Sequence, residues 1–416
     1  MPIPTSAIVV GNGIIGLTSA LALQQCGIAV TLVGPDASPT GASIGNAGHI
    51  AIEQVEPLAS RAVLRSLPRR LFAAGGPVSL PMRDIGAWLP FGLRLLRASS
   101  PDRFAQGKRT LGQLLSTAFP AWHRLAHAAG ADALLREGGH YVLWESSETA
   151  ADGRARWACA DTGEAQWRDA TPAELETLQA LLRVPVAGAI RFEGSGQVTD
   201  LDALVRALYA AFRAAGGTFR QGTAKEIIPG DADAAEVILA NGDRVKAGAI
   251  LVAAGTASAA LLTPLGMRAP IVAERGYHIQ SLASGWPLAL PPVVFEDRSI
   301  IATRFADGLR LAGFTEFGRE CSPPDPRKWL RLRQHAAALG LPLTEPVREW
   351  MGARPTLPDY LPAIGRSGRH PGIFYAFGHQ HLGLTLAAAT AEAVAAMFAG
   401  EPADFDLAPL SLDRFR

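Results

Sequence analysis

The sequence predicts an α/β protein that contains a Rossmann-like nucleotide-binding unit. Three observations carry this prediction. A glycine-rich turn joins a short apolar strand to a helix near the N-terminus, and a second buried strand ends in small residues at Gly255. A third strand, over residues 373–377, precedes a long alanine-rich helix. Strands and helices that alternate in this way form parallel sheets covered by helices.

The first element is a βαβ unit, with a strand over residues 7–10, a helix over 17–25 and a second strand over 28–33. Its turn has the dinucleotide fingerprint, in which the first glycine permits the tight turn and the second admits a pyrophosphate. The third glycine lets helix and strand pack closely. We therefore expect a dinucleotide at the helix N-terminus. The expected contacts are Gly11, Gly13, Ile14, Ile15 and Gly16.

One part of the fingerprint is missing. An acidic residue normally ends the second strand and binds the ribose hydroxyls, but Gly34 stands there, followed by Pro35 and Asp36. Two alternatives remain: Asp36 binds the ribose after a local shift, or backbone groups and water do so.

Three further segments complete the predicted site. Residues 40–49 form a loop rich in Gly, Ser and Asn, which offers hydrogen-bond donors and close backbone approach. The strand over 249–255 ends in Ala254 and Gly255, and a motif over 352–359 precedes the last strand. The final helix, over 386–398, opens with residues 378–385, so its N-terminal amides can face an electron-rich ring edge.

Composition limits the classes of function. The chain has 416 residues, with 39 Lys or Arg, 38 Asp or Glu and a net charge of +1. The chain as a whole therefore lacks the excess of positive charge that is typical of nucleic-acid-binding proteins. Cys26, Cys159 and Cys321 lie far apart without a CxxC motif, which excludes a zinc ribbon or disulfide framework. No basic region precedes the first apolar run, and no run of about 18 apolar residues occurs. We expect a cytoplasmic protein without a membrane-spanning helix.

Residues 62–97 mix large apolar side chains with arginines. A basic, apolar segment of this kind can lie on a membrane surface. The alternative is a segment of a substrate domain with a solvated arginine face. If the first holds, the protein contacts the inner face of the membrane peripherally.

The motifs, in this order and spacing, resemble the FAD-dependent amine oxidoreductases of the D-amino-acid oxidase class over nearly the whole chain. The shared parts are VVGNGIIG, SIGNAG, the AAG strand end, GARPTLPD and the GHxxLGxT helix start. RGY at 275–277, TRF at 303–305 and LRLAG at 309–313 are nearest to the bacterial D-amino-acid dehydrogenases. GHQH in place of GHGT, and His49 after NAG, are similar to the D-hydroxyproline dehydrogenase branch.

The resemblance implies noncovalent FAD and two interleaved domains. Residues 1–60, 195–272 and 350–416 would form the FAD-binding domain, and 61–194 and 273–349 an α+β substrate domain with an antiparallel sheet over the flavin. In the sequence, the segments 286–297, 298–301 and 309–314 are typical of successive β-strands. Covalently flavinylated relatives use a cysteine near the C-terminal motif, from which Cys321 is remote. Beyond the fingerprint, the expected FAD contacts are Asp36, Ser43, Asn46, Ala47, Gly48, Ala254, Gly255, Gly352, His381, Leu382, Gly383, Leu384 and Thr385.

The implied reaction moves hydride from the Cα–H of a D-amino acid to flavin N5 and leaves an imine. Because a guanidinium grips a carboxylate with two parallel hydrogen bonds, Arg354 in GARPTLPD and Arg304 in TRF are the candidate carboxylate ligands. Tyr277 either binds the same carboxylate or is a half-buried strand residue. The histidines near motif loops either serve the substrate amine or a ring hydroxyl, or are satisfied core residues. They are His49, His278, His379 and His381.

No metal is expected, because His379, His381 and His49 have no evident carboxylate or cysteine partner. The favoured substrates are cis-4-hydroxy-D-proline and D-proline. The alternatives are a D-alanine-type dehydrogenase, a glycine or sarcosine oxidase, an NAD(P) enzyme without flavin, and an FAD-bearing subunit that is inactive alone. The sequence does not identify the electron acceptor. The dehydrogenase branch implies a quinone or a dye-linked chain.

Overall fold

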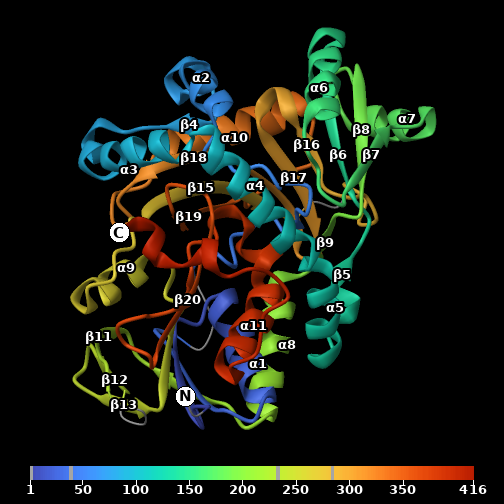
Figure 1. Cartoon of the computed structure of the whole chain (residues 1–416). Helices are drawn as coiled ribbons and strands as arrows, with labels where there is room; N and C mark the ends of the chain where they lie inside the picture. The colour runs from blue at the N-terminus through green and yellow to red at the C-terminus, as the bar shows by residue number, and fades with distance from the viewer. Residues whose placement is uncertain (1–2, 37–40, 231–234, 283–284) are drawn as a thin grey trace.

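The computed structural model describes residues 3–36, 41–230, 235–282 and 285–416. Two large sheets organise these residues, one mainly parallel and one mainly antiparallel (Figure 1). Thr40, the first residue of the predicted glycine-rich loop, lies outside the described residues. The predicted combination of a Rossmann-like unit with an antiparallel sheet is confirmed.

The parallel sheet has six strands drawn from distant parts of the chain. Its order is β10-β2-β1-β14-β21-β20, and only β20 runs antiparallel to its neighbour. All of β14 and β21 and most of β1 are buried, which explains their continuous apolar runs. The strands are β1 (Ser6–Val10), β2 (Ala29–Gly34), β10 (Thr218–Gln221), β14 (Ala249–Val252), β20 (Ala363–Arg366) and β21 (Ile373–Phe377).

Helices cover one face of this sheet and a small second sheet lies against the other. Helix α1 packs between α8 and α11, and α5 packs on the outside of α11 (Figure 1). A separate apolar core joins the opposite face to the β11-β12-β13 sheet and α9. These elements are α1 (Ile14–Gln25), α5 (Ala118–Ala128), α8 (Leu201–Ala214), α9 (Ser258–Leu262), α11 (Gly383–Ala399), β11 (Ala224–Ile228), β12 (Ala235–Leu239) and β13 (Arg244–Ala247).

The second large sheet has the order β19-β15-β18-β17-β16-β6-β8-β7, with β4 added beside β18. It is antiparallel except at the β16–β6 and β18–β4 pairs. Its strands are β4 (Val78–Ser79), β6 (His140–Trp144), β7 (Gln166–Asp169), β8 (Gly188–Glu193), β15 (Val272–Ser281), β16 (Val293–Phe295), β17 (Ile300–Phe305), β18 (Gly308–Gly318) and β19 (Arg348–Thr356).

Helices and a third small sheet surround the antiparallel sheet. Helix α10 packs against β15 and β18, and α2 and α3 both lie in the upper part of the view in Figure 1. The short strand β3 pairs with β9, which pairs in turn with β5. The elements are α2 (Arg61–Arg70), α3 (Ile85–Ala98), α4 (Pro101–Ser116), α6 (Ser147–Cys159), α7 (Pro172–Leu181), α10 (Pro326–Leu339), β3 (His49–Ile50), β5 (Leu135–Arg136) and β9 (Gly196–Val198).

Two details differ from the sequence prediction. The domain boundary predicted at residue 350 falls inside β19, which pairs with β15 along its whole length and so belongs to the antiparallel sheet. The segment from Trp286 to Asp297, predicted as a strand, forms only the three-residue β16, because the loop before it carries prolines without a backbone N–H for the ladder.

One segment of the structure, Gln380–Ala399, is long and apolar enough to cross a membrane, contrary to the sequence expectation. However, 67% of its 18-residue window is buried inside the protein. Burial against α1 and α5 therefore accounts for its apolar composition, as in the core helix of a doubly wound fold.

Candidate functional site

The carboxyl ends of β1, β14 and β21 open into a cavity, here called the nucleotide cavity. The N-termini of α1 and α11 both border it, so two sets of helix amides face the same space. Of the predicted cofactor residues, those that line the nucleotide cavity are Gly11, Gly13, Ile14, Ile15, Ser43, Asn46, Ala254, Gly255, Gly383 and Leu384.

The fingerprint glycines show that this cavity fits a dinucleotide. A Cβ at Gly11 would lie 2.4 Å from the Ala253 carbonyl oxygen, and a Cβ at Gly16 would lie 1.8 Å from the Gly11 carbonyl oxygen. Both glycines are therefore required by the packing of the protein itself. At Gly13, by contrast, the nearest atom to such a Cβ is the Ser43 Oγ at 3.4 Å, an ordinary contact. The packing of the protein does not require a glycine at position 13. The missing side chain instead leaves room for a pyrophosphate.

Asn12 explains the missing acidic residue at the end of β2. A Cβ at Gly34 would lie 2.3 Å from the Asn12 side chain, which fills that space and donates a hydrogen bond to the Asp36 carbonyl oxygen at 2.6 Å. Asp36 itself is exposed and does not line the nucleotide cavity. Its predicted contact with a ribose stays a prediction.

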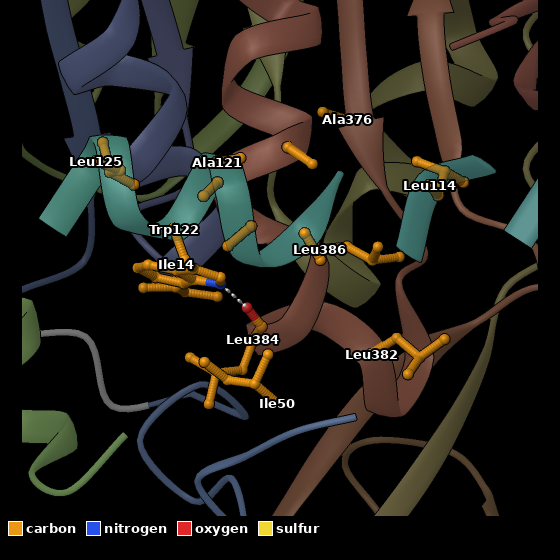
Figure 2. Close-up of a cluster of buried hydrophobic side chains, with 14 of the residues drawn as sticks. Ile14, Ile50, Leu114, Ala121, Trp122, Leu125, Ala376, Leu382, Leu384 and Leu386 are labelled. Atoms are coloured by element: carbon orange, nitrogen blue, oxygen red, sulfur yellow. Dashed lines mark hydrogen bonds between the residues drawn. The ribbon is translucent and has the colours of Figure 1, made fainter. Parts of the chain in front are cut away.

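Buried packing fixes the two helix N-termini relative to one another. The Trp122 indole N–H of α5 donates to the Leu384 carbonyl oxygen at 2.9 Å, and Ile14 of α1 belongs to the same apolar core (Figure 2). Trp122 is fully buried, and the first turn of α11 is held between α5 and α1. A shift of α11 would therefore open a void in the core, which keeps its N-terminus aimed at the nucleotide cavity.

A second cavity, here called the substrate cavity, adjoins the first. Arg354 and Asn46 line both cavities. The Arg354 Nη1 donates to Glu274 at 3.2 Å, which is its only hydrogen-bond partner among the described residues, and 31% of its side chain is exposed. Most of its N–H groups are therefore available where the two cavities adjoin, and they could donate two parallel hydrogen bonds to a carboxylate.

Two predicted histidines line the substrate cavity. His381 Nε2 lies 2.6 Å from the Gln54 Oε1, and His49 lies on the short strand β3. Burial lowers the pKa of each ring to about 4, so both are neutral at pH 7. Neutral imidazoles offer one donor and one acceptor each, which suits contact with a polar substrate.

The other two predicted histidines lie elsewhere. His379 lines the nucleotide cavity, where its Nε2 lies 3.0 Å from the Thr390 hydroxyl and burial lowers its pKa to about 3. His278 lines neither of the two cavities, because its ring stacks on Trp350 and bonds the Gly45 carbonyl oxygen.

Arg304 and Tyr277 are also absent from the lining of both cavities. Arg304 donates to the backbone of the next residue, Phe305. The Tyr277 hydroxyl donates to Glu316 at 3.2 Å, and the side chain is 1% exposed in the core of the antiparallel sheet. Arg310 holds the glycine-rich loop instead, since it donates to the carbonyl oxygens of Ile44 and Asn46.

The remaining predicted cofactor contacts separate into lining and packing residues. Ala47 and His381 line the substrate cavity rather than the nucleotide cavity. Gly48 is close-packed, as a Cβ there would lie 2.5 Å from the Phe305 ring, and Gly352 is packed against Trp350 in the same way. Leu382 is buried in the core, and the Thr385 hydroxyl accepts the Ala51 N–H at 3.0 Å. The last four residues, Gly48, Gly352, Leu382 and Thr385, position the site without lining either cavity.

Sequence reasoning missed Glu53 and His140, which line the substrate cavity beside His49. Glu53 is 4% exposed, and burial raises its pKa to about 7. His140 is 2% exposed, and burial places its pKa well below the usual value. The nearness of Glu53 to the NAGH motif is a weak signal in the sequence. His140 offers none, because only the pairing of β6 within the antiparallel sheet brings it to this place.

The chain matches the family model described as FAD dependent oxidoreductase over residues 6–397. A D-amino-acid oxidase of Bradyrhizobium diazoefficiens is 30% identical, with full coverage of both chains. A D-amino acid dehydrogenase of Cereibacter sphaeroides is 27% identical over 98% of this chain and 95% of that one.

Solved structures with the same fold include a glycine oxidase from Geobacillus kaustophilus, with a TM-score of 0.72, 22% identity and 98% coverage of both chains. An L-proline dehydrogenase from P. horikoshii has a TM-score of 0.73 and 16% identity, over 100% of this chain and 98% of that one. At these identities the likeness shows the fold alone. It says nothing of the substrate or its handedness.

Proposed function

The chain belongs to the family of FAD-dependent oxidoreductases, and we propose that it oxidises a small D-amino acid at its Cα–N bond. The relatives of Bradyrhizobium and Cereibacter, which are named for D-amino acids, support this class of substrate. The observation that carries the proposal is the position of Arg354, which lines both the nucleotide cavity and the substrate cavity. A carboxylate held there would lie beside the cofactor.

The chain's own residues bind and orient the substrate. The Arg354 guanidinium pairs with the substrate carboxylate. Its hydrogen bond to Glu274 fixes the orientation of the guanidinium, and Glu274 is itself held by hydrogen bonds from Thr356 and Tyr360. The bound FAD supplies the two-electron acceptor for the Cα–H hydride, which leaves the substrate as an imine. The neutral His49 and His381 rings line the same cavity and place no cation beside the substrate amine.

Anaerobic bleaching of the flavin tests this proposal. The purified holoenzyme is mixed with matched D- and L-amino acids and the absorbance of the oxidised flavin is followed. D-amino acids should bleach it and their L-enantiomers should not. Bleaching by L-enantiomers alone would contradict the handedness. Absence of bleaching by every amino acid, and of dye reduction by the single chain, would favour a subunit that is inactive alone.

Within this class we propose cis-4-hydroxy-D-proline as the best substrate and D-proline as the next. The polar rings of His49 and His381 in the substrate cavity support this choice, because a buried polar group left without a partner penalises any analogue that lacks the hydroxyl. His379 lines the nucleotide cavity and is not needed for it. A higher kcat/KM for D-alanine or D-methionine than for both prolines would favour the general D-amino-acid dehydrogenase.

We propose that the FAD is held noncovalently. The three cysteines are exposed and none lines the nucleotide cavity or the substrate cavity. Acid precipitation should release yellow FAD into the supernatant. Colour that stays with the protein pellet would contradict noncovalent attachment.

We also propose peripheral contact with an anionic membrane surface, where a quinone would accept the electrons. Helix α3 exposes a stripe of Ile85, Leu89, Leu93 and Leu96, the last two by 57% and 59%. Exposed arginines on α2, in the turn before α3 and near the end of α3 would complement anionic lipid. They are Arg61, Arg65, Arg69, Arg83 and Arg97.

Sedimentation with vesicles tests the membrane contact. The protein should pellet with phosphatidylglycerol vesicles and less with phosphatidylcholine vesicles, and Leu93→Glu with Leu96→Glu should release it. Leu330→Glu is the matched control, because Leu330 is equally exposed on α10 at 56%. Equal pelleting of the two variants would contradict docking through α3.

A further inference from the structure

Three buried side chains meet in the substrate cavity and form what we call the acceptor cluster. They are His49 on β3, Glu53 in the loop that follows, and His140 on β6. One ligating atom from each lies within 4.8 Å of the other two, and the Glu53 Oε1 is 4.0 Å from the His140 Nε2. No hydrogen bond joins any two of these three side chains within the described residues. A gap therefore separates three polar atoms that face one another.

Two polar atoms of the cluster lack a hydrogen-bond partner within the described part of the chain. Among the described residues, the Glu53 Oε2 and the His49 Nε2 are buried and have no hydrogen-bond partner. His140 bonds Ser195 through its Nδ1 at 2.7 Å, and its ring stacks on Phe192, which together fix the Nε2 toward Glu53. Buried polar atoms without a partner are costly, so a group that pairs with them would gain binding free energy here.

The size of the gap distinguishes a metal ion from a hydrogen-bonded atom. Ligands about 2.1 Å from a tetrahedral zinc ion lie roughly 3.4 Å apart, closer than the 4.0 Å between Glu53 and His140. An atom central to a triangle with sides up to 4.8 Å lies at most about 2.8 Å from each corner, a hydrogen-bond length. The spacing therefore favours a nitrogen or oxygen held by hydrogen bonds.

We propose that the acceptor cluster binds a hydrogen-bond-donating group, a hydroxyl or an ammonium, on the side chain of the substrate. Glu53 is then the specificity-determining residue, because its carboxylate is the strongest acceptor of the three. The inference rests on the proposed function, in which Arg354 holds the carboxylate in the same cavity. The ring hydroxyl of cis-4-hydroxy-D-proline is one source of the donor, and the terminal ammonium of a diamino acid is the other.

Matched substrate pairs test the proposal on the wild-type holoenzyme. The pair cis-4-hydroxy-D-proline and D-proline differs by a hydroxyl, and the pair D-ornithine and D-norvaline by an ammonium. In one of the two pairs the donor-bearing member should have a kcat/KM at least 10-fold higher, because its absence leaves Glu53 unpaired. The pair that shows the difference identifies the source of the donor.

Substitution of Glu53 assigns the effect to the cluster. Glu53→Gln should reduce the preference within that pair at least 10-fold, whereas Glu296→Gln should keep it. Glu296 is the matched control because it lines the same cavity but already accepts hydrogen bonds from Arg156 and Trp157. FAD content is measured for both variants.

A binding measurement covers the case in which a variant loses FAD. Neither α-methyl-D-ornithine nor α-methyl-D-norvaline carries the Cα–H that is oxidised, so their dissociation constants follow from perturbation of the flavin absorbance of the wild type. Tighter binding of the ornithine analogue supports the ammonium source.

The outcomes separate the two proposals. If D-amino acids bleach the flavin but both pairs give equal kcat/KM values, the acceptor-cluster proposal fails and the proposed function stands. A preference that survives Glu53→Gln also overturns the acceptor-cluster proposal. If no amino acid bleaches the flavin, the proposed function itself fails.

Discussion

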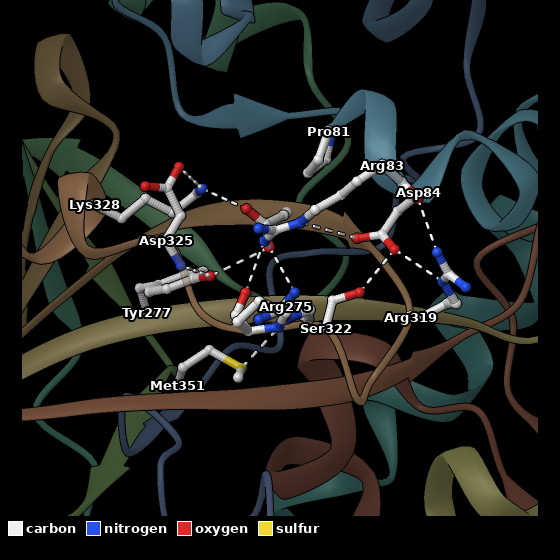
Figure 3. A network of polar contacts seen from close by, with 12 residues as sticks. Pro81, Arg83, Asp84, Arg275, Tyr277, Arg319, Ser322, Asp325, Lys328 and Met351 are labelled. Atoms are coloured by element: carbon white, nitrogen blue, oxygen red, sulfur yellow. Dashed lines mark hydrogen bonds and ion pairs between the residues drawn. The ribbon is translucent and has the colours of Figure 1, made fainter.

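Two groups of buried charged and polar side chains differ in whether they have partners. In the antiparallel sheet, Arg275 and Lys328 are both 0% exposed and both pair with Glu316, and Lys328 also reaches Asp325 (Figure 3). Tyr277 adds a hydrogen bond to Glu316 and accepts one from the Asp325 N–H. Two cations and two anions therefore balance inside the core, and the network ties α10 to β15 and β18.

The acceptor cluster also contains a buried glutamate, but its two neighbours are histidines that burial keeps neutral. Among the described residues no cation pairs with Glu53, and burial raises its pKa to about 7. A buried ion pair holds elements together, whereas a buried carboxyl without a cationic partner costs stability until a ligand supplies one. The paired network therefore serves the architecture and the unpaired cluster serves binding.

The turn after β1 shows the same contrast between structural and binding residues, because Gly16 serves packing and Gly13 leaves space for the ligand. The largest expected effect is on FAD binding at Gly13. Gly13→Val should abolish FAD binding, because the side chain fills the space left for the pyrophosphate, while the fold remains. The ratio of flavin to protein absorbance measures the bound FAD, and circular dichroism measures the fold. Gly16→Ala is the control, since its Cβ would strike the Gly11 carbonyl and should lower the unfolding temperature as well. If the Gly13→Val protein keeps its FAD, the cofactor does not bind in the nucleotide cavity.

Breaking the paired network should cost the most stability. Glu316→Gln leaves Arg275 and Lys328 buried with only Asp325 as an anion, which is expected to lower the free energy of unfolding by about 3–5 kcal/mol. Urea unfolding of the holoenzyme measures the change. The control is Glu345→Gln, which removes the exposed partner of Arg333 and should change stability by less than about 1 kcal/mol. Equal effects of the two would show that the network is not structural.

Removing the Glu53 carboxyl should raise the free energy of unfolding, opposite to the effect of Glu316→Gln. The pKa of Glu53 is about 7 in the folded protein and near 4.5 in the unfolded chain, so the folded state holds the extra proton between these values. The contribution of Glu53 to stability therefore falls as pH rises from about 4.5 to 7, and its penalty is complete above pH 7. Glu53→Gln removes it and should stabilise the protein by roughly 3 kcal/mol at pH 8, with no gain near pH 4.

Thermal unfolding of wild type and Glu53→Gln across pH 4–8 checks this sign. The two neighbouring histidines are common to both proteins, so their own titration cancels in the difference. Glu296→Gln is the control, since Glu296 already has an arginine partner and its removal should bring no gain at pH 8. A loss of stability at pH 8 in Glu53→Gln would mean that the carboxylate is paired in the folded protein.

Local patterns in the sequence predicted the parallel sheet and the nucleotide cavity well. The turn after β1, the strand β21 and the start of α11 each depend on residues that are adjacent in the chain, and glycines mark them. The large antiparallel sheet was harder, because the side that a strand residue faces depends on register. Arg310 contacts the glycine-rich loop and Arg304 does not, although both lie in motifs of the same family.

The acceptor cluster lay beyond sequence reasoning for a related reason. His49 and Glu53 are four residues apart, but His140 comes from β6, whose place beside β16 and β8 depends on long-range pairing. The sequence analysis grouped His49 with His379 and His381 and found no carboxylate for that set, whereas in the structure His379 lines the nucleotide cavity and the other two line the substrate cavity. Burial and the absence of a partner, which distinguish Glu53 from other carboxylates, are properties of the folded chain only.

The smallest expected effect concerns Arg354, which stands between the two extremes because one of its N–H groups is paired and the others are free. Arg354→Lys keeps the charge but replaces the fork with a single donor, so kcat/KM should fall roughly 10- to 150-fold, or about 1.5–3 kcal/mol. The loss should appear mainly in KM, since the guanidinium holds the carboxylate before and during the reaction. Arg304→Lys is the matched control, because Arg304 lines neither the nucleotide cavity nor the substrate cavity. If Arg354→Lys leaves kcat/KM unchanged and Arg304→Lys lowers it, Arg304 rather than Arg354 binds the substrate carboxylate.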